Sequence, residues 1–200
     1  MRHDGAREAA GAGAREATPR TIAGQNVGVP RRGTPTSGQS SLRVRTATDA
    51  DLPTIVEMRL ALLRNHPDHP IYGRLRHDAR ERAYAVFGSQ LRSPNEAMFL
   101  AERDGEVVGI LRCVDTPNSP LLHPDKYCYV SSVYVRPAAR RRGVLKALLQ
   151  RARSWCTERG LSEMRLHNVP SGVASAAWQA EGFTVVEEVR LRHLGDGTQD

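Results

Sequence analysis

A run of seven cationic side chains lies between Arg136 and Arg153, and no acidic residue interrupts it. The run starts where an apolar stretch stops at Pro137, passes Gly143, and continues into a segment whose leucines recur at helical spacing. Proline removes a backbone donor and stops a strand, whereas glycine lets the backbone lie against a ligand. A strand, a cationic loop and a helix N-terminus in succession form an anion site, because free N–H groups and the helix dipole both favour negative charge. This order predicts a site for a diphosphate.

The segment from Val135 to Leu149 resembles the acyl-CoA pyrophosphate loop of the GCN5-related N-acetyltransferase (GNAT) family. The family pattern is a hydrophobic strand that ends in Val-x-Pro, followed by Arg/Gln-x-x-Gly-x-Gly/Ala at the start of a helix. This sequence reads Val135-Arg136-Pro137 and then Arg140-Arg141-Arg142-Gly143-Val144-Leu145. It departs from the family at the last position, where Leu145 replaces the usual Gly or Ala. A solvated basic helix face is the alternative interpretation of the charge run, and the order of strand, glycine and helix disfavours it.

A second stretch resembles the family's Tyr-x-x-x-Gly-Phe pattern. Trp178 stands where the tyrosine usually is, and Gly182-Phe183 match the Gly-Phe pair. Ser171 stands where the family often has asparagine. On its own, a glycine followed by phenylalanine also fits a helix C-terminus and a core aromatic residue. The position of this pair downstream of the cationic loop favours the family interpretation.

The resemblance covers residues 42–194 and implies the GNAT fold, an α/β (α+β) arrangement in which helices flank a central mixed β-sheet. It implies transfer of an acetyl group from acetyl-CoA to a primary amine of a small molecule or a peptide, with no other cofactor and no metal. Strand backbone would bind the pantetheine arm, and the loop would bind the pyrophosphate. The expected cofactor-binding residues are Val133, Val135, Arg140, Arg141, Arg142, Gly143, Val144, Leu145, Lys146 and Ser171.

The attacking amine must lose a proton, so a carboxylate or histidine is expected near the strand that ends at Val135. That strand holds neither, and the remaining candidates for the base are His167, Asp115 and His123. In the family a tyrosine protonates the leaving thiolate, but the indole of Trp178 only donates a hydrogen bond. The substitutes are solvent, Tyr127, Tyr129 and Tyr134. We select Tyr134, His167 and Trp178 as candidate catalytic residues, with Trp178 packed on the cofactor arm.

The composition is that of a folded, positively charged protein. The 200 residues are 40% hydrophobic and 26% charged, and the formal net charge is +7. The three cysteines are too few and too widely spaced for a disulfide framework or a zinc site, so we expect buried, reduced thiols. The sequence shows neither an apolar run of membrane-spanning length nor a signal peptide, and we expect a cytoplasmic protein without membrane contact.

Two other functions compete with catalysis. A basic nucleic-acid-binding protein would explain the net charge, but the few aromatic side chains and the lack of a recognised nucleic-acid motif disfavour it. A non-catalytic acyl-CoA-binding module would explain Trp178, Leu145 and the missing carboxylate. The sequence motifs of P-loop nucleotide hydrolases, dinucleotide-binding folds, zincins and serine hydrolases are absent. A homodimer is left open.

Residues 1–41 differ in composition from the rest of the chain. They are rich in small residues, lack aromatic side chains and carry net positive charge, so we expect a disordered, low-complexity basic tail. The folded domain is expected at 42–194, followed by a flexible C-terminus at 195–200. Periodicity and turn signals predict strands at 42–46, 96–103, 106–115, 126–135, 161–168 and 184–194, and helices at about 52–63, 77–91, 142–158 and 171–180.

Overall fold

The structure, a computed structural model, describes residues 41–169 and 172–194. The predictions for 1–40, for Ser171 and for 195–200 lie outside the described residues. The strands are β1 (Arg43–Thr46), β2 (Glu96–Arg103), β3 (Glu106–Pro117), β4 (Lys126–Val135) and β5 (Met164–Leu166). The helices are α1 (Leu52–Arg64), α2 (Ala79–Leu91), α3 (Val144–Glu158) and α4 (Gly172–Ala180), with short 3-10 turns η1 (Asp49–Asp51) and η2 (Pro137–Ala139).

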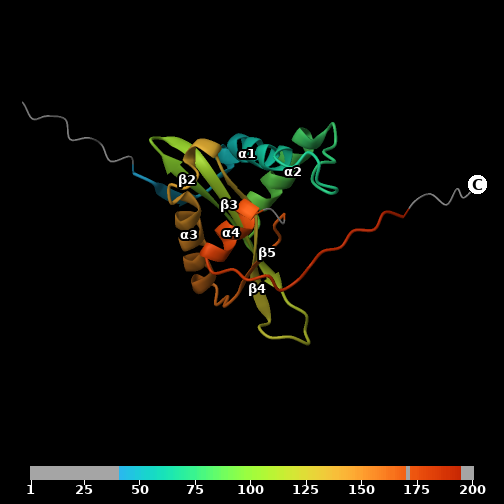
Figure 1. Cartoon of the computed structure of the whole chain (residues 1–200). Coiled ribbons are helices and arrows are strands. Elements are labelled where there is room, and N and C mark those ends of the chain that lie inside the picture. Colours follow the sequence, from blue (N-terminus) through green and yellow to red (C-terminus); the bar gives the residue numbers. More distant parts are fainter. Residues whose placement is uncertain (1–40, 170–171, 195–200) are drawn as a thin grey trace, which may run out of the picture. The chain divides into compact units, whose positions relative to one another are not determined.

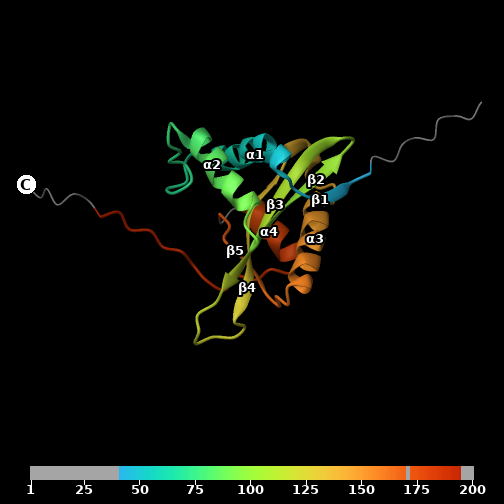
Figure 2. The ribbon, with the colours of Figure 1, turned by 180° about the vertical axis from the view of Figure 1, so that it is seen from behind.

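A mixed sheet with the strand order β1-β2-β3-β4-β5 forms the centre of the described domain. The first four strands pair antiparallel, and β5 pairs with β4 in parallel. Helices α1 and α2 cover one face of the sheet, and α3 covers the other (Figure 1 and Figure 2). The predicted fold, a central mixed sheet flanked by helices, is confirmed.

Each face of the sheet carries its own apolar core. Leu111 and Leu148 are fully buried in the core beneath α3, whereas Ile55 and Ile110 are fully buried in the core beneath α1 and α2. Neighbouring residues of a strand point to opposite faces, so adjacent side chains of β3 enter different cores. Full burial of one such side chain stabilises the fold by about 1.5–3 kcal/mol.

Hydrogen bonds fix the start of α1 against β1. The Asp51 carboxylate accepts the Thr48 N–H at 2.8 Å, which completes a capping box. Arg45 of β1 donates to both oxygens of Asp51 at 2.8 Å each, and to Glu102 of β2 at 2.7 Å. The hydrogen bond from Arg45 lowers the pKa of Asp51 to about 2. This network therefore joins two strands to the first helix.

Strand β4 contains a β-bulge that the sequence analysis did not predict. Ser131 and Tyr134 pair with Arg112 and Ile110, so two residues of β4 stand opposite one residue of β3. Ser132 takes a φ of 53°, which side chains other than glycine rarely adopt. The extra residue changes which side chains face which core, because the alternation shifts by one position. After the bulge, Tyr134 lies in the core beneath α1 and α2.

The predicted strand at 184–194 is wrong, because the structure assigns no strand to these residues. Val185, Val186 and Val189 are largely exposed despite their strand-like pattern. A strand needs a partner edge, and the neighbouring edge strand β5 has only three residues. Strand β5 is also shorter than predicted, and α2 and α3 each begin two residues later than predicted.

The three cysteines are buried free thiols, as predicted. Cys113 of β3, Cys128 of β4 and Cys156 of α3 contact one another. The neighbouring Cys113 thiol raises the pKa of Cys128 to about 12, and burial acts in the same direction, so this thiol stays protonated. Within the described ranges, no three His, Cys, Asp or Glu side chains are grouped to hold a metal ion. No helix there is long and apolar enough to cross a membrane.

Candidate active site

The start of α3 presents unpaired backbone donors. The helix begins after Gly143, and the first N–H to bond back is that of Ala147, which donates to the Gly143 carbonyl at 3.0 Å. In the described part of the chain, the N–H groups of Val144, Leu145 and Lys146 have no hydrogen-bond acceptor. Free N–H groups at a helix N-terminus bind phosphate well, because the helix dipole adds to their partial charges.

Exposed cations surround these donors. Arg140, Arg141 and Lys146 form no salt bridge with any acid of the described residues. Arg140 instead donates through Nε to the Val135 carbonyl at 3.1 Å, which ties the loop to the end of β4. An anion that binds here meets both free N–H groups and cations, and it displaces no acidic side chain.

Two glycines allow this loop and helix to form. Gly143 has a φ of 78°, and a Cβ added to it would meet nothing within 4 Å, so the space above it is open to a ligand. Gly109 of β3 lies beneath α3, where an added Cβ would lie 2.9 Å from Val144 Cγ1 and 3.2 Å from Leu148 Cδ1. Gly109 therefore lets the first turns of α3 pack directly on the sheet.

The edge of β4 that faces away from β3 is open beyond β5. Strand β5 pairs only with Cys128–Val130. The N–H of Arg136 donates to the Val108 carbonyl of β3 at 2.9 Å. Because successive residues direct their backbone groups to opposite edges, the groups of Val135 point to the open edge. An extended ligand can pair with this edge as an added strand would.

A polar pair spans the junction of β4 and β5. The hydroxyl of Tyr129 lies 3.3 Å from Nδ1 of His167, and the two rings meet edge to face with centroids 5.5 Å apart. Burial raises the pKa of Tyr129, so its phenol stays protonated. The His167 side chain is exposed and follows β5 directly. The structure thus brings one predicted residue, His167, together with a tyrosine that was only an alternative.

The other two base candidates lie elsewhere. The Asp115 carboxylate is only 9% exposed and pairs with two cations, at 3.4 Å and 3.9 Å. His123 is almost fully exposed in the loop 118–125, at the tip of the hairpin formed by β3 and β4. That tip projects away from α1 and α2 in both views (Figure 1 and Figure 2). His167 is the base candidate that lies at the open edge of β4.

The remaining predicted residues pack inside the domain. Tyr134 is buried in the core beneath α1 and α2. Trp178 of α4 meets Phe183 edge to face with centroids 5.4 Å apart, and both pack against the core beneath α3. Leu145 packs against the same core. Ser171 lies outside the described residues.

Comparison with known proteins decides the family. The model of the Acetyltransferase (GNAT) family matches residues 59–183, which is more than half of the chain. The chain belongs to the acetyltransferase (GNAT) family. An aminoglycoside N(6')-acetyltransferase type 1 from Klebsiella aerogenes is 30% identical over 98 residues. The matched part spans 48% of this chain and 64% of the length of that curated relative.

Solved structures share the GNAT fold. A predicted acetyltransferase from Clostridium acetobutylicum, solved with acetyl-CoA, has a TM-score of 0.62 and 19% identity, and covers 76% of this chain and 96% of its own. The aminoglycoside N-acetyltransferase AAC(6')-Iy, solved in complex with CoA, has a TM-score of 0.65 and 22% identity, and covers 80% of this chain and 98% of its own. At these identities the likeness establishes the fold.

This GNAT chain also holds a cationic cluster that the sequence analysis missed. Arg59 of α1 comes four residues after the buried Ile55, so it lies on the helix face that packs on the sheet. It is half-buried and faces Tyr72, Tyr129 and Arg112. The signal that could have revealed it is the cation itself, because arginine is out of place in the apolar stripe of a helix.

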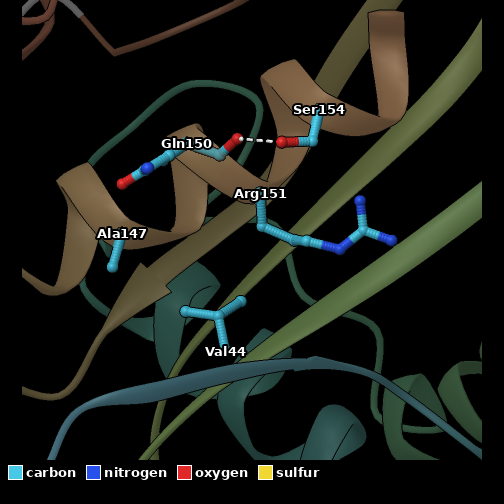
Figure 3. Close-up of a pocket in the computed structure, with 5 residues that line it drawn as sticks. All are labelled: Val44, Ala147, Gln150, Arg151 and Ser154. Atoms are coloured by element: carbon cyan, nitrogen blue, oxygen red, sulfur yellow. Dashed lines mark hydrogen bonds between the residues drawn. The ribbon is translucent and has the colours of Figure 1, made fainter. Parts of the chain in front are cut away.

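A separate groove lies between α3 and β1, at the opposite edge of the sheet from β5 (Figure 3). It has a volume of about 290 Å³ and is lined by Val44, Ala147, Gln150, Arg151 and Ser154. The Arg151 guanidinium lies over the Phe99 ring at 4.8 Å, and the Ser154 hydroxyl donates to the Gln150 carbonyl at 3.3 Å. The Arg151 and Ser154 side chains therefore already have partners within the protein.

Proposed function

We propose that this protein transfers an acetyl group from acetyl-CoA to a primary amine. The observation that carries the proposal is the set of three unpaired N–H groups, from Val144 to Lys146, at the start of α3. They stand among exposed cations and beyond the open edge of β4, and this combination fits a diphosphate joined to an extended arm. The GNAT structures solved with acetyl-CoA or CoA support the choice of donor.

Backbone and charge together would hold the donor. The N–H groups of residues 141–146 would bind the pyrophosphate, with Arg140, Arg141 and Arg142 supplying positive charge around it. The backbone of Val133 and Val135 would pair with the pantetheine arm. An N–H near Val133 would donate to the thioester carbonyl oxygen and stabilise the charge that develops there.

The transfer itself needs a positioned amine and one base. The amine nitrogen attacks the thioester carbonyl carbon, so a C–N bond forms while the C–S bond breaks. The amine proton passes to the base, and the departing thiolate takes up a proton. Proximity and orientation supply much of the rate. A thiol pKa of about 8.5 makes the thiolate a tolerable leaving group.

His167 is the base that the geometry supports best. When Nδ1–H donates to the Tyr129 hydroxyl oxygen, the Nε2 lone pair is free to accept the amine proton. Protonation of the thiolate by Tyr134 stays a prediction, because that side chain is buried beneath α1 and α2. Contact of Trp178 with the cofactor arm also stays a prediction. The choice of an amine as the acceptor is supported by the curated relative, which is named as an aminoglycoside acetyltransferase.

Substitution of Gly143 tests the donor site. Gly143→Glu places a carboxylate where the diphosphate would lie, so we expect acetyl-CoA affinity to fall by at least about tenfold. Gly160→Glu is the matched control, because Gly160 also has positive φ, with nothing within 4 Å of an added Cβ, but lies after the other end of α3. Both variants carry the same charge and similar backbone strain, and calorimetry should show weaker binding only for Gly143→Glu.

A thiol-release assay with acetyl-CoA and a panel of amines tests the transfer. Release that depends on both the amine and Gly143 supports the enzyme. Absence of acetyl-CoA binding to the wild type at millimolar ligand overturns the donor assignment. Tight binding without thiol release for any amine would instead favour the non-catalytic module.

A further inference from the structure

Arg59 places a half-buried positive charge near Tyr129, the residue that contacts the proposed base. It comes from the sheet-facing side of α1 and interacts electrostatically with Tyr129, whose hydroxyl contacts His167 at 3.3 Å. Tyr72 also interacts electrostatically with Arg59 and is held by His69, which accepts the Tyr72 N–H at 3.1 Å. The guanidinium thus stands where an acceptor must come to reach the base.

The positive charge of Arg59 is not compensated by any acidic group in the described part of the chain. Arg112, the other cation of the cluster, donates to the Glu96 carboxylate at 2.7 Å and to the Ser131 hydroxyl at 3.0 Å. Arg59 makes no hydrogen bond and no salt bridge to any described residue. The cluster therefore holds two guanidinium groups and one carboxylate.

Such a charge is costly to retain unless something binds it. Burial lowers the pKa of Arg59, but a guanidinium stays protonated in proteins, so it cannot escape by losing its proton. A partly buried charge without a partner destabilises the fold, whereas an apolar side chain of similar size would not. A ligand anion would supply the missing partner, and the planar guanidinium suits a carboxylate or a phosphate.

We propose that Arg59 binds an anionic group of the acceptor, so that the substrate is a small amine that also carries a carboxylate or a phosphate. This inference rests on the proposed acetyl transfer and specifies its acceptor class. It separates this chain from its aminoglycoside-acetylating relative, because aminoglycosides carry several positive charges and this cluster repels them.

Matched acceptor pairs test the inference in the thiol-release assay. L-alanine and β-alanine are compared with their methyl esters, O-phosphoethanolamine is compared with ethanolamine, and kanamycin is the polycation. An ester lowers the basicity of its amine and leaves more of it neutral, so intrinsic reactivity favours the esters over the acids. We expect the wild type to favour at least one anionic member by about 10- to 100-fold in kcat/KM. The pair in which the anionic amine is preferred shows whether Arg59 binds a carboxylate or a phosphate.

Arg59→Gln should abolish that preference by raising KM for the anionic amine, with little change for its neutral partner. Arg64→Gln is the control, because Arg64 is an exposed arginine at the end of the same helix and should keep the preference. Equal or better use of the neutral amines or kanamycin by the wild type overturns the inference. So does an anion preference that survives in Arg59→Gln.

Unfolding measurements test Arg59 without any turnover. Arg59→Met should leave the urea midpoint unchanged or raise it, because it removes an unpaired charge. Arg112→Met should lower the midpoint, because it leaves the Glu96 carboxylate without its partner. A large loss in Arg59→Met shows a structural role and overturns the inference. One combination of results would separate the two proposals. If no amine releases thiol, the proposed transfer fails. The anion site still stands if Arg59→Met is stabilising and inorganic phosphate raises the melting temperature of the wild type but not that of Arg59→Met.

Discussion

The contact between Tyr129 and His167 sets how a proton could leave the acceptor. The phenol oxygen and Nδ1 lie 3.3 Å apart, so one ring nitrogen is occupied and the other can face the substrate. A hydrogen bond of this kind fixes both the tautomer and the orientation of an imidazole. The pair thus connects β4, which would bind the donor, to the group that would activate the acceptor.

Removal of the imidazole should change the pH profile of acetyl transfer. A base works only when it is unprotonated, so wild-type kcat/KM should fall as the solution becomes acidic. His167→Ala should lower kcat by about 10²- to 10⁴-fold and change the shape of that acidic decline. Tyr129→Phe keeps the ring but loses the oxygen that orients Nδ1, so we expect a smaller loss and a shifted profile.

Steady-state rates over a pH series measure both effects, with Tyr127→Phe as a control on the same strand. The guanidinium of Arg165 covers the Tyr127 ring at 4.1 Å, so this hydroxyl variant should keep the wild-type profile. A kcat that stays unchanged in His167→Ala would show that another group accepts the proton. Tyr134→Phe separately measures whether the buried tyrosine protonates the thiolate.

Single residues differed in how well the sequence predicted their roles. His167 could be selected because few titratable side chains lie near the relevant strand. Its contact with Tyr129 could not be predicted, because the register between β4 and β5 joins residues far apart in the chain. Arg59 was missed because arginines on amphipathic helices usually lie in solvent, and only the packing of α1 on the sheet shows that this one is half-buried.

Among the elements, α3 depends on a close approach to β3. Gly109 provides it, because any side chain there would press on the first turns of the helix. The same turns carry the free N–H groups of the proposed donor site. Gly109 therefore determines the position of the proposed anion site, although it would not contact the ligand itself.

Gly109→Ala should destabilise the protein by about 1–3 kcal/mol, because the added methyl overpacks the contact with Val144 and Leu148. Gly88→Ala in α2 is the matched control. Its nearest neighbour would lie at 3.6 Å, and glycine inside a helix costs roughly 0.5–1 kcal/mol relative to alanine, so this variant should be more stable than the wild type. Urea unfolding measures both. Equal stability of Gly109→Ala and the wild type would contradict the close packing.

Local patterns predicted most elements because alternation and helical spacing are properties of consecutive residues. Strand β4 has the predicted bounds, and Gly160 follows α3 with a φ of 68°. The bulge at Ser132 escaped prediction, because it arises from pairing with β3 and leaves no pattern in β4 alone. The segment 184–194 shows the converse, since a strand-like pattern without a long partner edge forms no strand.

At the scale of the whole molecule, positive charge is divided between paired and unpaired groups. The net charge of +7 is visible in the composition, but composition does not tell which cations have partners. Arg45 and Arg112 are tied to carboxylates within the domain. Arg140, Arg141 and Lys146 form no salt bridge in the described part of the chain. Part of the unpaired charge thus lies at the proposed binding groups.

These unpaired loop cations repel one another when no anion is bound, and ionic strength controls that repulsion. Charges are screened over about 8 Å at physiological ionic strength, and over less as salt is added. Added sodium chloride should therefore raise the melting temperature of the ligand-free protein while it weakens acetyl-CoA binding. Thermal unfolding measures how the melting temperature changes with salt, and calorimetry measures how acetyl-CoA affinity changes with salt. Both dependences should be weaker in Arg141→Gln and unchanged in Arg64→Gln. An acetyl-CoA affinity that does not change with salt would show that the loop cations do not face the ligand. A melting temperature that rises with salt while affinity falls would mean that charge repulsion destabilises the empty loop, and that the bound ligand removes this repulsion.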